Sequence, residues 1–229
     1  MSLSEPIQKN IAEIKERIPR ACERSGRSSS EIKILAATKS RSIQEIQIAL
    51  DAGITLIGEN TVQEAKSKFA SLPGSVEKHL IGHLQKNKVK PALEFFDCIQ
   101  SVDSLKLAQE IERRAQALGK KATILIEVNI AGEASKFGVM PQSTLELVEH
   151  VSKLSHLQIQ GLMTVAPLIP PENVRPHFCQ MRELFDSLKT LLQTEVRWLS
   201  MGMSHDYEIA IEEGANLVRL GAAIFGPRS

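Results

Sequence analysis

The feature that most constrains the fold is an alternation of short apolar segments with amphipathic helical segments, which starts after Ser30. Most of the apolar segments are apolar almost without interruption, as in parallel strands covered on both faces. The eight predicted strands are 32–39, 54–60, 78–84, 98–102, 122–130, 159–165, 197–203 and 217–220. Eight successive strand-helix units predict either a closed (β/α)8 barrel or an open doubly wound sheet.

The segment after the first predicted strand favours the barrel. It reads TKSRS and lacks the glycine-rich turn that holds a pyrophosphate in an open dinucleotide-binding sheet. The chain has 229 residues and no linker rich in Pro, Gly or Ser, and α/β barrels of about 250 residues commonly form one unit. We therefore expect a single domain over 1–229, with an N-terminal helix and connector in 1–30 and the barrel in 31–229.

The spacing of apolar residues predicts two long helices. The first covers about 6–24, with isoleucines at helical spacing, and Pro19 is expected to bend it or end it early. The second covers about 174–192 and carries one apolar stripe that should lie against the outside of the sheet.

Two further helices show N-terminal signals. Ser42 with Glu45 has the spacing of a capping box, and Gly53 is placed to end that helix. Ser143 with Glu146 has the same spacing, so we expect a second capping box there.

Composition argues against several classes of function. The 28 Lys and Arg residues balance 27 Asp and Glu residues, and 4% of the chain is aromatic, so neither the charge nor the stacking surface of a nucleic-acid-binding protein is present. The N-terminal sequence does not resemble a secretory signal, and no apolar segment has the length of a membrane span. We expect a cytoplasmic protein in which Cys22, Cys98 and Cys179 are buried thiols.

The predicted strands end in polar residues. In a parallel barrel these ends meet at one rim, where such folds place their chemistry. The residues expected at this rim are Lys39, Asn60, His83, Ser101, Asn129, Ser204, Arg219 and Gly221.

Lys39 is the strongest single candidate for chemistry. It follows the apolar segment ILAAT, so its amine should enter a concave, partly desolvated site, where the neutral nucleophilic form can condense with an aldehyde. The alternative is a lysine that extends past the rim into solvent.

The ends of the last two strands predict an anion site. Ser204 is placed to cap the helix after the seventh strand, and Gly221 allows close approach after the eighth, the corner where barrels often bind phosphate. Alternatively, Gly221 and Gly226 serve only to turn the chain. Arg219 should face the same side as Gly221, toward either a ligand or a structural carboxylate.

The histidines do not predict a metal centre. His79 and His83 are expected to share one face of a strand without a third ligand. The consecutive residues Ser204, His205 and Asp206 are typical of a helix start rather than of a catalytic triad, whose members are brought together by folding.

Six segments together resemble the pyridoxal phosphate homeostasis protein family, whose barrel is similar to the N-terminal barrel of alanine racemase. They are GENTVQEAKSK (58–68), HLIGHLQKNKVK (79–90), EASKFGV (133–139), GLMTVAP (161–167), LSMGMSHDYEIAI (199–211) and VRLGAAIFG (218–226). The resemblance runs in order from Ile32 to Gly226 and implies a closed barrel of the fold-type III class, which uses pyridoxal 5′-phosphate (PLP).

The resemblance also implies roles for individual residues. Lys39 would carry PLP as a Schiff base, and Arg219 would face the pyridine nitrogen. The phosphate would be held by Ser204 and by the backbone of Gly221 and Ala222, where related sequences often carry Thr or Ser in place of Ala222. The remaining residues implied to lie around the cofactor are Asn60, His83, Met163 and Met201.

The function implied is intracellular PLP (vitamin B6) homeostasis and amino-acid balance, with no evident catalytic activity. An arginine at the pyridine nitrogen disfavours its protonation and so weakens the cofactor as an electron sink. The single tyrosine, Tyr207, is not expected to replace the catalytic base that racemases take from a second domain. The alternatives are a fold-type III racemase or lyase and a PLP-responsive module that binds a regulatory protein; PLP-dependent apo-enzymes are further candidate partners.

Overall fold

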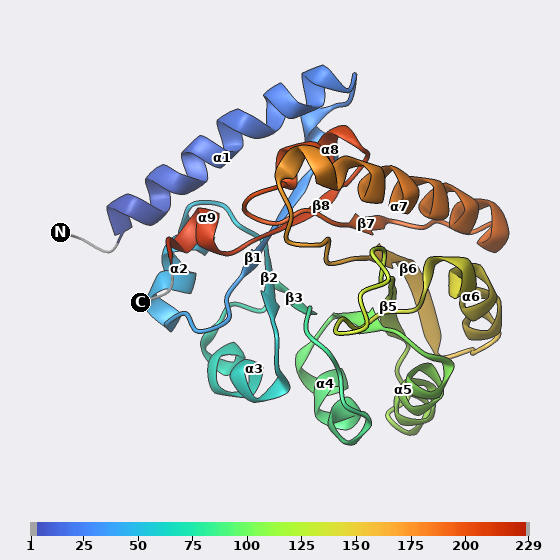
Figure 1. The fold of residues 1–229 in the computed structure, drawn as a ribbon. Coiled ribbons are helices and arrows are strands. Elements are labelled where there is room, and N and C mark those ends of the chain that lie inside the picture. The colour runs from blue at the N-terminus through green and yellow to red at the C-terminus, as the bar shows by residue number, and fades with distance from the viewer. Residues whose placement is uncertain (1–3, 228–229) are drawn as a thin grey trace.

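The computed structural model describes residues 4–227, which contain a closed barrel of eight parallel strands in chain order, with β1 paired to β8 (Figure 1). The predicted (β/α)8 class is therefore confirmed. The strands are β1 (Lys33–Ala37), β2 (Leu56–Glu59), β3 (Glu77–Leu80), β4 (Cys98–Val102), β5 (Ala122–Glu127), β6 (Leu157–Met163), β7 (Trp198–Ser200) and β8 (Leu217–Leu220).

Helices surround the barrel, and α1 lies outside it beside α8 and α9 (Figure 1). The α-helices are α1 (Ser4–Arg24), α2 (Ile43–Asp51), α3 (Val62–Lys68), α4 (Val89–Phe95), α5 (Leu105–Ala117), α6 (Thr144–Ser152), α7 (Pro171–Leu192), α8 (Tyr207–Glu212) and α9 (Ala222–Phe225). Short 3-10 helices are η1 (Ser29–Glu31), η2 (Phe69–Ser71), η3 (Lys86–Lys88) and η4 (Pro141–Ser143). No helix among these is long and apolar enough to cross a membrane.

Several strands end earlier than predicted. Single backbone hydrogen bonds continue past several strand ends, as from the Thr38 amide to the Gly58 carbonyl at 2.9 Å, but the regular ladder stops before the apolar pattern does. His83, for example, lies three residues beyond the end of β3 rather than within it.

Helix α1 continues past Pro19 to Arg24, so the early end that was one of the two outcomes predicted for this proline does not occur. Buried residues lie on both sides of the proline, from Ile7 to Cys22. Packing of this face against the barrel helices outweighs the one backbone hydrogen bond that proline removes.

The two predicted capping boxes differ. At α2 both hydrogen bonds are present, from the Glu45 amide to Ser42 Oγ at 3.2 Å and from the Ser42 amide to the Glu45 carboxylate at 2.8 Å. Gly53 follows α2 with φ +89°, as expected for a residue that ends a helix. The second box is absent, because η4 places Ser143 at φ −101° and ψ 1°, away from the extended conformation of a capping residue.

Two apolar cores result from the alternation of side chains along the strands. The larger core lies between the barrel and its helices, and it includes the buried stripe of α7 that was predicted. The inner core fills the barrel and consists of Leu35, Leu56, Cys98, Leu125, Met163, Trp198 and Leu217. Cys22 and Cys98 are buried thiols as predicted, whereas Cys179 is only partly covered and its Sγ lies 3.0 Å from the Glu213 carboxylate.

Candidate functional site

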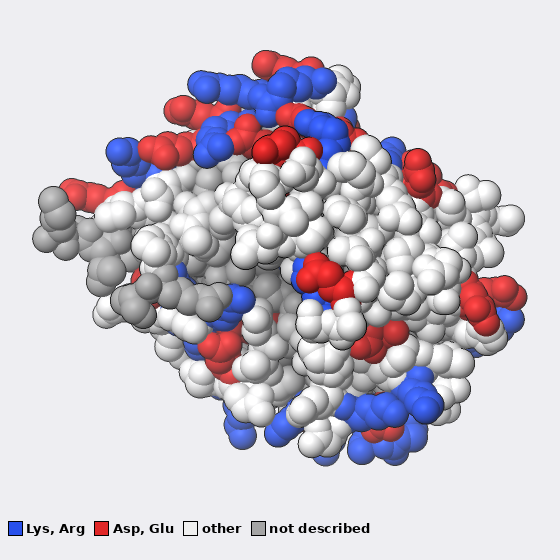
Figure 2. Space-filling view, in the orientation of Figure 1, with Lys and Arg blue, Asp and Glu red and all other residues white. Residues whose placement is uncertain are grey.

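A cavity of about 500 Å³ lies at the carboxyl ends of the strands. A hollow is visible in the middle of this face, while charged side chains gather mainly around its margin (Figure 2). The predicted site residues that line the cavity are Lys39, Asn60, His83, Ser204, Arg219, Gly221 and Ala222.

The other two predicted residues do not line the cavity. Met163 ends β6 and packs in the inner core below the cavity. Met201 belongs to the outer core, because Trp198 and Ser200 face inward and the alternation turns Met201 outward. The prediction that Met163 and Met201 contact a ligand therefore finds no support in their positions.

The backbone beside Lys39 is fixed by a buried polar cluster. Thr38 Oγ1 donates to the Glu59 carboxylate at 2.7 Å, and the Thr38 amide donates to the Gly58 carbonyl at 2.9 Å. Lys68 Nζ donates to the Thr38 carbonyl and to Glu59, both at 2.9 Å. Burial raises the pKa of Glu59, although its bonds to Lys68 and Thr38 oppose this. The cluster fixes the point at which Lys39 leaves β1 and enters the cavity.

Arg219 is buried, with 4% of its surface exposed, where β8 meets the cavity. Its guanidinium donates to Ser200 Oγ at 2.7 Å and to the Thr164 carbonyl at 2.6 Å. Burial lowers the pKa of Arg219 to about 10, which still leaves the guanidinium charged at neutral pH. These neutral partners hold a cation against the cavity wall.

Ser204 has a different structural role from the one predicted. Helix α8 begins at Tyr207, and Asp206 rather than Ser204 is its capping position, with Asp206 Oδ1 accepting from the Met203 amide at 2.6 Å. Ser204 Oγ instead accepts from the Ala223 amide in the first turn of α9 at 3.0 Å. The segments after β7 and β8 thus meet at the N-terminal end of α9, and this turn offers a hydroxyl and amides to the cavity.

Glu127 is a cavity residue that the sequence interpretation missed. It ends β5, is 8% exposed, and its Oε2 has no hydrogen-bond partner. Burial and the nearby charge of Asp103 raise its pKa to about 7, and Arg219 opposes the shift. An acidic residue inside the apolar segment ILIEVNI is the signal that could have identified it.

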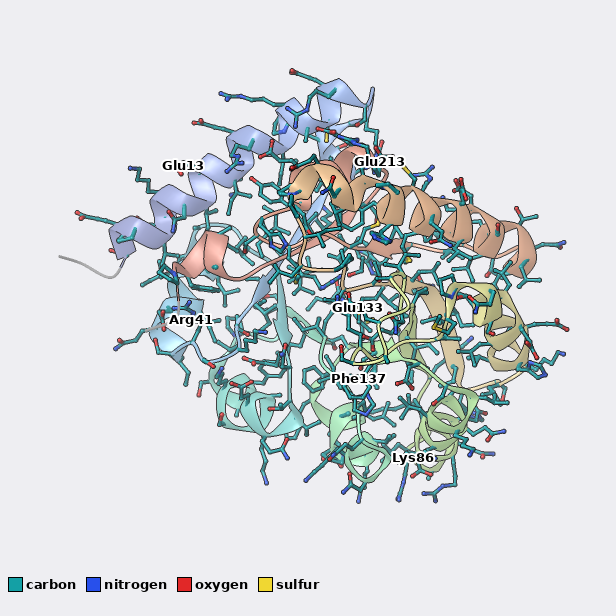
Figure 3. The ribbon with its side chains drawn as sticks, viewed as in Figure 1. Glu13, Arg41, Lys86, Glu133, Phe137 and Glu213 are labelled. Atoms are coloured by element: carbon teal, nitrogen blue, oxygen red, sulfur yellow. The ribbon has the colours of Figure 1, made fainter. Side chains whose placement is uncertain are left out.

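The loop after β5 forms one wall of the cavity through Ser135, Lys136 and Phe137. Phe137 stacks on His83 with the ring centres 3.7 Å apart and the planes 12° apart. Glu133 and Phe137 both come from this loop in front of the strands (Figure 3).

Two residues predicted for the rim have other positions. Asn129 does not line the cavity, and its amide donates to the carbonyls of Glu133 and Lys136 at 2.9 and 3.3 Å, which holds the loop. Ser101 is buried within β4, and its hydroxyl has no partner.

Among residues 4–227, no group of three potential metal ligands occurs. The predicted shared face of His79 and His83 is wrong. His79 is buried inside the barrel, whereas His83 lies beyond the strand and lines the cavity.

The closed (β/α)8 barrel, with a cavity lysine after β1 and a buried arginine on β8, has the features that the resemblance to alanine racemase-type barrels implies. In agreement, the family model of the alanine racemase N-terminal domain matches residues 5–229. The alanine racemase of Clostridium difficile 630 superposes with a TM-score of 0.74, covering 98% of this chain and 57% of that chain, and at 14% identity the likeness concerns the fold alone.

Two relatives define the family more narrowly. The pyridoxal phosphate homeostasis protein of Aquifex aeolicus is 43% identical over 95% of this chain and 96% of its own length. The solved structure of PipY from Synechococcus elongatus, with PLP bound, has a TM-score of 0.83 and 33% identity and covers 96% of this chain and 100% of that chain. The chain belongs to the pyridoxal phosphate homeostasis protein family.

Proposed function

We propose that this protein binds PLP covalently through Lys39 and acts in intracellular PLP homeostasis and amino-acid balance. The observation that carries the proposal is the convergence of a lysine, a buried arginine and the first turn of α9 on one cavity. The names of its relatives and the PLP bound to PipY support the same function.

The residues present fit this cofactor. A cavity of about 500 Å³ falls within the roughly 300–1,000 Å³ of small-molecule sites. Ser204 and the amides at the start of α9 suit a phosphate, and the missing hydroxyl at Ala222 leaves the backbone amide as the donor there. Arg219 can only donate hydrogen bonds, so it suits the unprotonated ring nitrogen.

PLP supplies an aldehyde carbon and an electron-withdrawing ring when bound. Arg219 would place a positive charge beside the ring nitrogen and so would oppose its protonation, which would limit stabilisation of a carbanion. Tyr207 is 2% exposed and is not part of the cavity wall. These features support a protein that holds and releases PLP without turnover.

Attachment is tested by borohydride reduction of the PLP-loaded protein, followed by peptide mapping. The reduced adduct is expected on Lys39, and Lys39→Ala should abolish the Schiff-base absorption while the protein remains folded. Lys136→Ala is the matched control, because Lys136 also lines the cavity. An adduct that maps to Lys136, or a loaded protein without any adduct, would contradict the proposal.

A fold-type III enzyme is the second candidate, because Glu127 gives the same cavity a carboxyl that can exchange a proton near neutral pH. The two functions are separated by incubating the PLP-loaded protein with amino acids in heavy water. A carrier should exchange the Cα proton no faster than free PLP, whereas rapid exchange that Glu127→Gln abolishes would establish the enzyme.

Transfer to other proteins is a further part of the proposal. PLP-dependent apo-enzymes or a regulatory protein would be the partners, and the association is expected to follow PLP occupancy. Affinity purification with the loaded protein and with Lys39→Ala tests this, and equal recovery of every partner in both would contradict it.

A further inference from the structure

A chain of buried hydrogen bonds extends from Arg219 across the inside of the barrel. Arg219 bonds to Ser200 Oγ at 2.7 Å, and Ser200 Oγ bonds to Gln100 Oε1 at 2.7 Å. Gln100 Nε2 bonds to His79 Nδ1 at 2.6 Å, and His79 Nε2 bonds to Glu77 Oε1 at 2.8 Å. The chain joins four strands, since these residues lie on β8, β7, β4 and β3.

The direction of these bonds follows from the chemistry of the two ends. A guanidinium only donates, so Ser200 accepts from Arg219 and gives its single hydrogen to the Gln100 oxygen. The Gln100 amide nitrogen then donates to His79 Nδ1, which must be unprotonated. His79 Nε2 therefore carries the hydrogen and donates to Glu77. All four bonds point the same way, from a cation to a carboxylate.

The far end of the chain lies away from the cavity. Glu77 is the first residue of β3, at the opposite end of the barrel, and its side chain is 33% exposed. The hydrogen bond from His79 lowers the pKa of Glu77, so the acceptor is a carboxylate at neutral pH. The inner members Ser200, Gln100 and His79 are each fully buried, and hydrogen bonds in a low dielectric strengthen one another when they are aligned.

We propose that Ser200, Gln100 and His79 are positioning residues that hold the Arg219 guanidinium in one orientation, and that Glu77 fixes the direction of the chain. None of the four touches the cavity, so they act through Arg219. Their effect on the bound cofactor rests on the proposed function, whereas the chain itself belongs to the protein without cofactor.

The chain is tested first on the protein without PLP, by ¹⁵N NMR of the histidine side chains. The signal of His79 is assigned by its loss in His79→Gln. It should be the neutral tautomer with hydrogen on Nε2, and a hydrogen on Nδ1 would overturn the proposal whether or not PLP binds.

Gln100→Glu gives a second readout on the same sample. A carboxylate still accepts from Ser200 but cannot donate to His79. His79 should then carry hydrogen on both ring nitrogens, between two carboxylates, and its ¹⁵N shifts should change accordingly. Unchanged shifts would show that Gln100 does not donate to His79 and would overturn the proposal.

The effect on the site is tested with serine variants of the PLP-loaded protein. Ser200→Ala should weaken PLP binding by about fivefold to tenfold, the usual effect of losing one hydrogen bond, and should shift the Schiff-base absorption band. Ser200→Thr keeps the hydroxyl and should restore both. Ser101→Ala is the matched control, because Ser101 is also a buried barrel serine but its hydroxyl has no partner.

The outcomes separate the two proposals. If Ser200→Ala behaves like Ser101→Ala while the normal protein binds PLP, the positioning role is refuted. If the normal protein does not bind PLP at all, the proposed function fails, and the NMR result alone decides whether the chain exists.

Discussion

Glu127→Gln should make the protein without PLP more stable at alkaline pH and change little at acidic pH. Burial and the charge of Asp103 raise the pKa of Glu127 from 4.5 to about 7. The folded state therefore holds this proton more tightly than the unfolded state does. The resulting stability is fully present below about pH 4.5 and is lost as the pH rises toward 7.

The size of the effect follows from the difference between the pKa of 4.5 in the unfolded state and about 7 in the folded state. About 2.5 pKa units at about 1.36 kcal/mol each correspond to a loss of about 3 kcal/mol once the pH exceeds 7. Part of this loss has already occurred at pH 5. The contribution of Glu127 to the free energy of unfolding should therefore fall by roughly 2.5 kcal/mol between pH 5 and pH 8. Glutamine has nearly the same shape and carries no charge, so its variant should lack this contribution.

The assay is urea unfolding of the normal protein and of Glu127→Gln at pH 5 and at pH 8. The difference in the free energy of unfolding between the two proteins should grow by roughly 2.5 kcal/mol toward pH 8, in favour of the variant. Glu94→Gln, at an exposed position on α4, controls for removing one negative charge. An equal pH dependence of the normal protein and Glu127→Gln would refute the reasoning.

Two further predictions concern the local structure. Ser42→Ala should lower the free energy of unfolding by about 1 kcal/mol, because it removes a capping box that is formed. Ser143→Ala should leave the free energy of unfolding nearly unchanged. Thermal unfolding compares the two variants, and equal losses would contradict the assignment. Gly82→Ala should weaken PLP binding, because a Cβ at this cavity residue would lie 2.3 Å from the Asn60 carbonyl oxygen and would displace the backbone. A PLP titration measures the affinity, and an unchanged affinity would show that the Asn60 backbone does not shape the site.

Much of the fold could be predicted from the sequence because it depends on local patterns. Eight apolar segments separated by amphipathic helices define the barrel, and β4 and β8 have the predicted bounds. The errors occur where tertiary contacts decide. Packing carries α1 past Pro19, and η4 prevents Ser143 from capping α6.

The candidate site was predictable where the position relative to a strand end was enough, as for Lys39. The site was not predictable where the direction of a side chain depended on the exact residue at which the strand ends. Because β7 ends at Ser200 with that side chain inward, Met201 faces the helices. The acidic residue within ILIEVNI marks Glu127 as a candidate, but the pattern alone does not distinguish a carboxyl that faces a cavity from one that meets a buried partner.

The sequence left two interpretations of Arg219, a ligand contact and a structural ion pair, and its partners distinguish them. No carboxylate in residues 4–227 forms an ion pair with it, and its hydrogen bonds go to a hydroxyl and a carbonyl. A buried cation without a contacting carboxylate is costly to folding. Glu127 and Asp206 act on it only at longer range, and Glu127 itself resists ionisation because it is buried. This cost is explained if the guanidinium is kept for a hydrogen-bond acceptor that enters the cavity, and the ring nitrogen of PLP is such an acceptor.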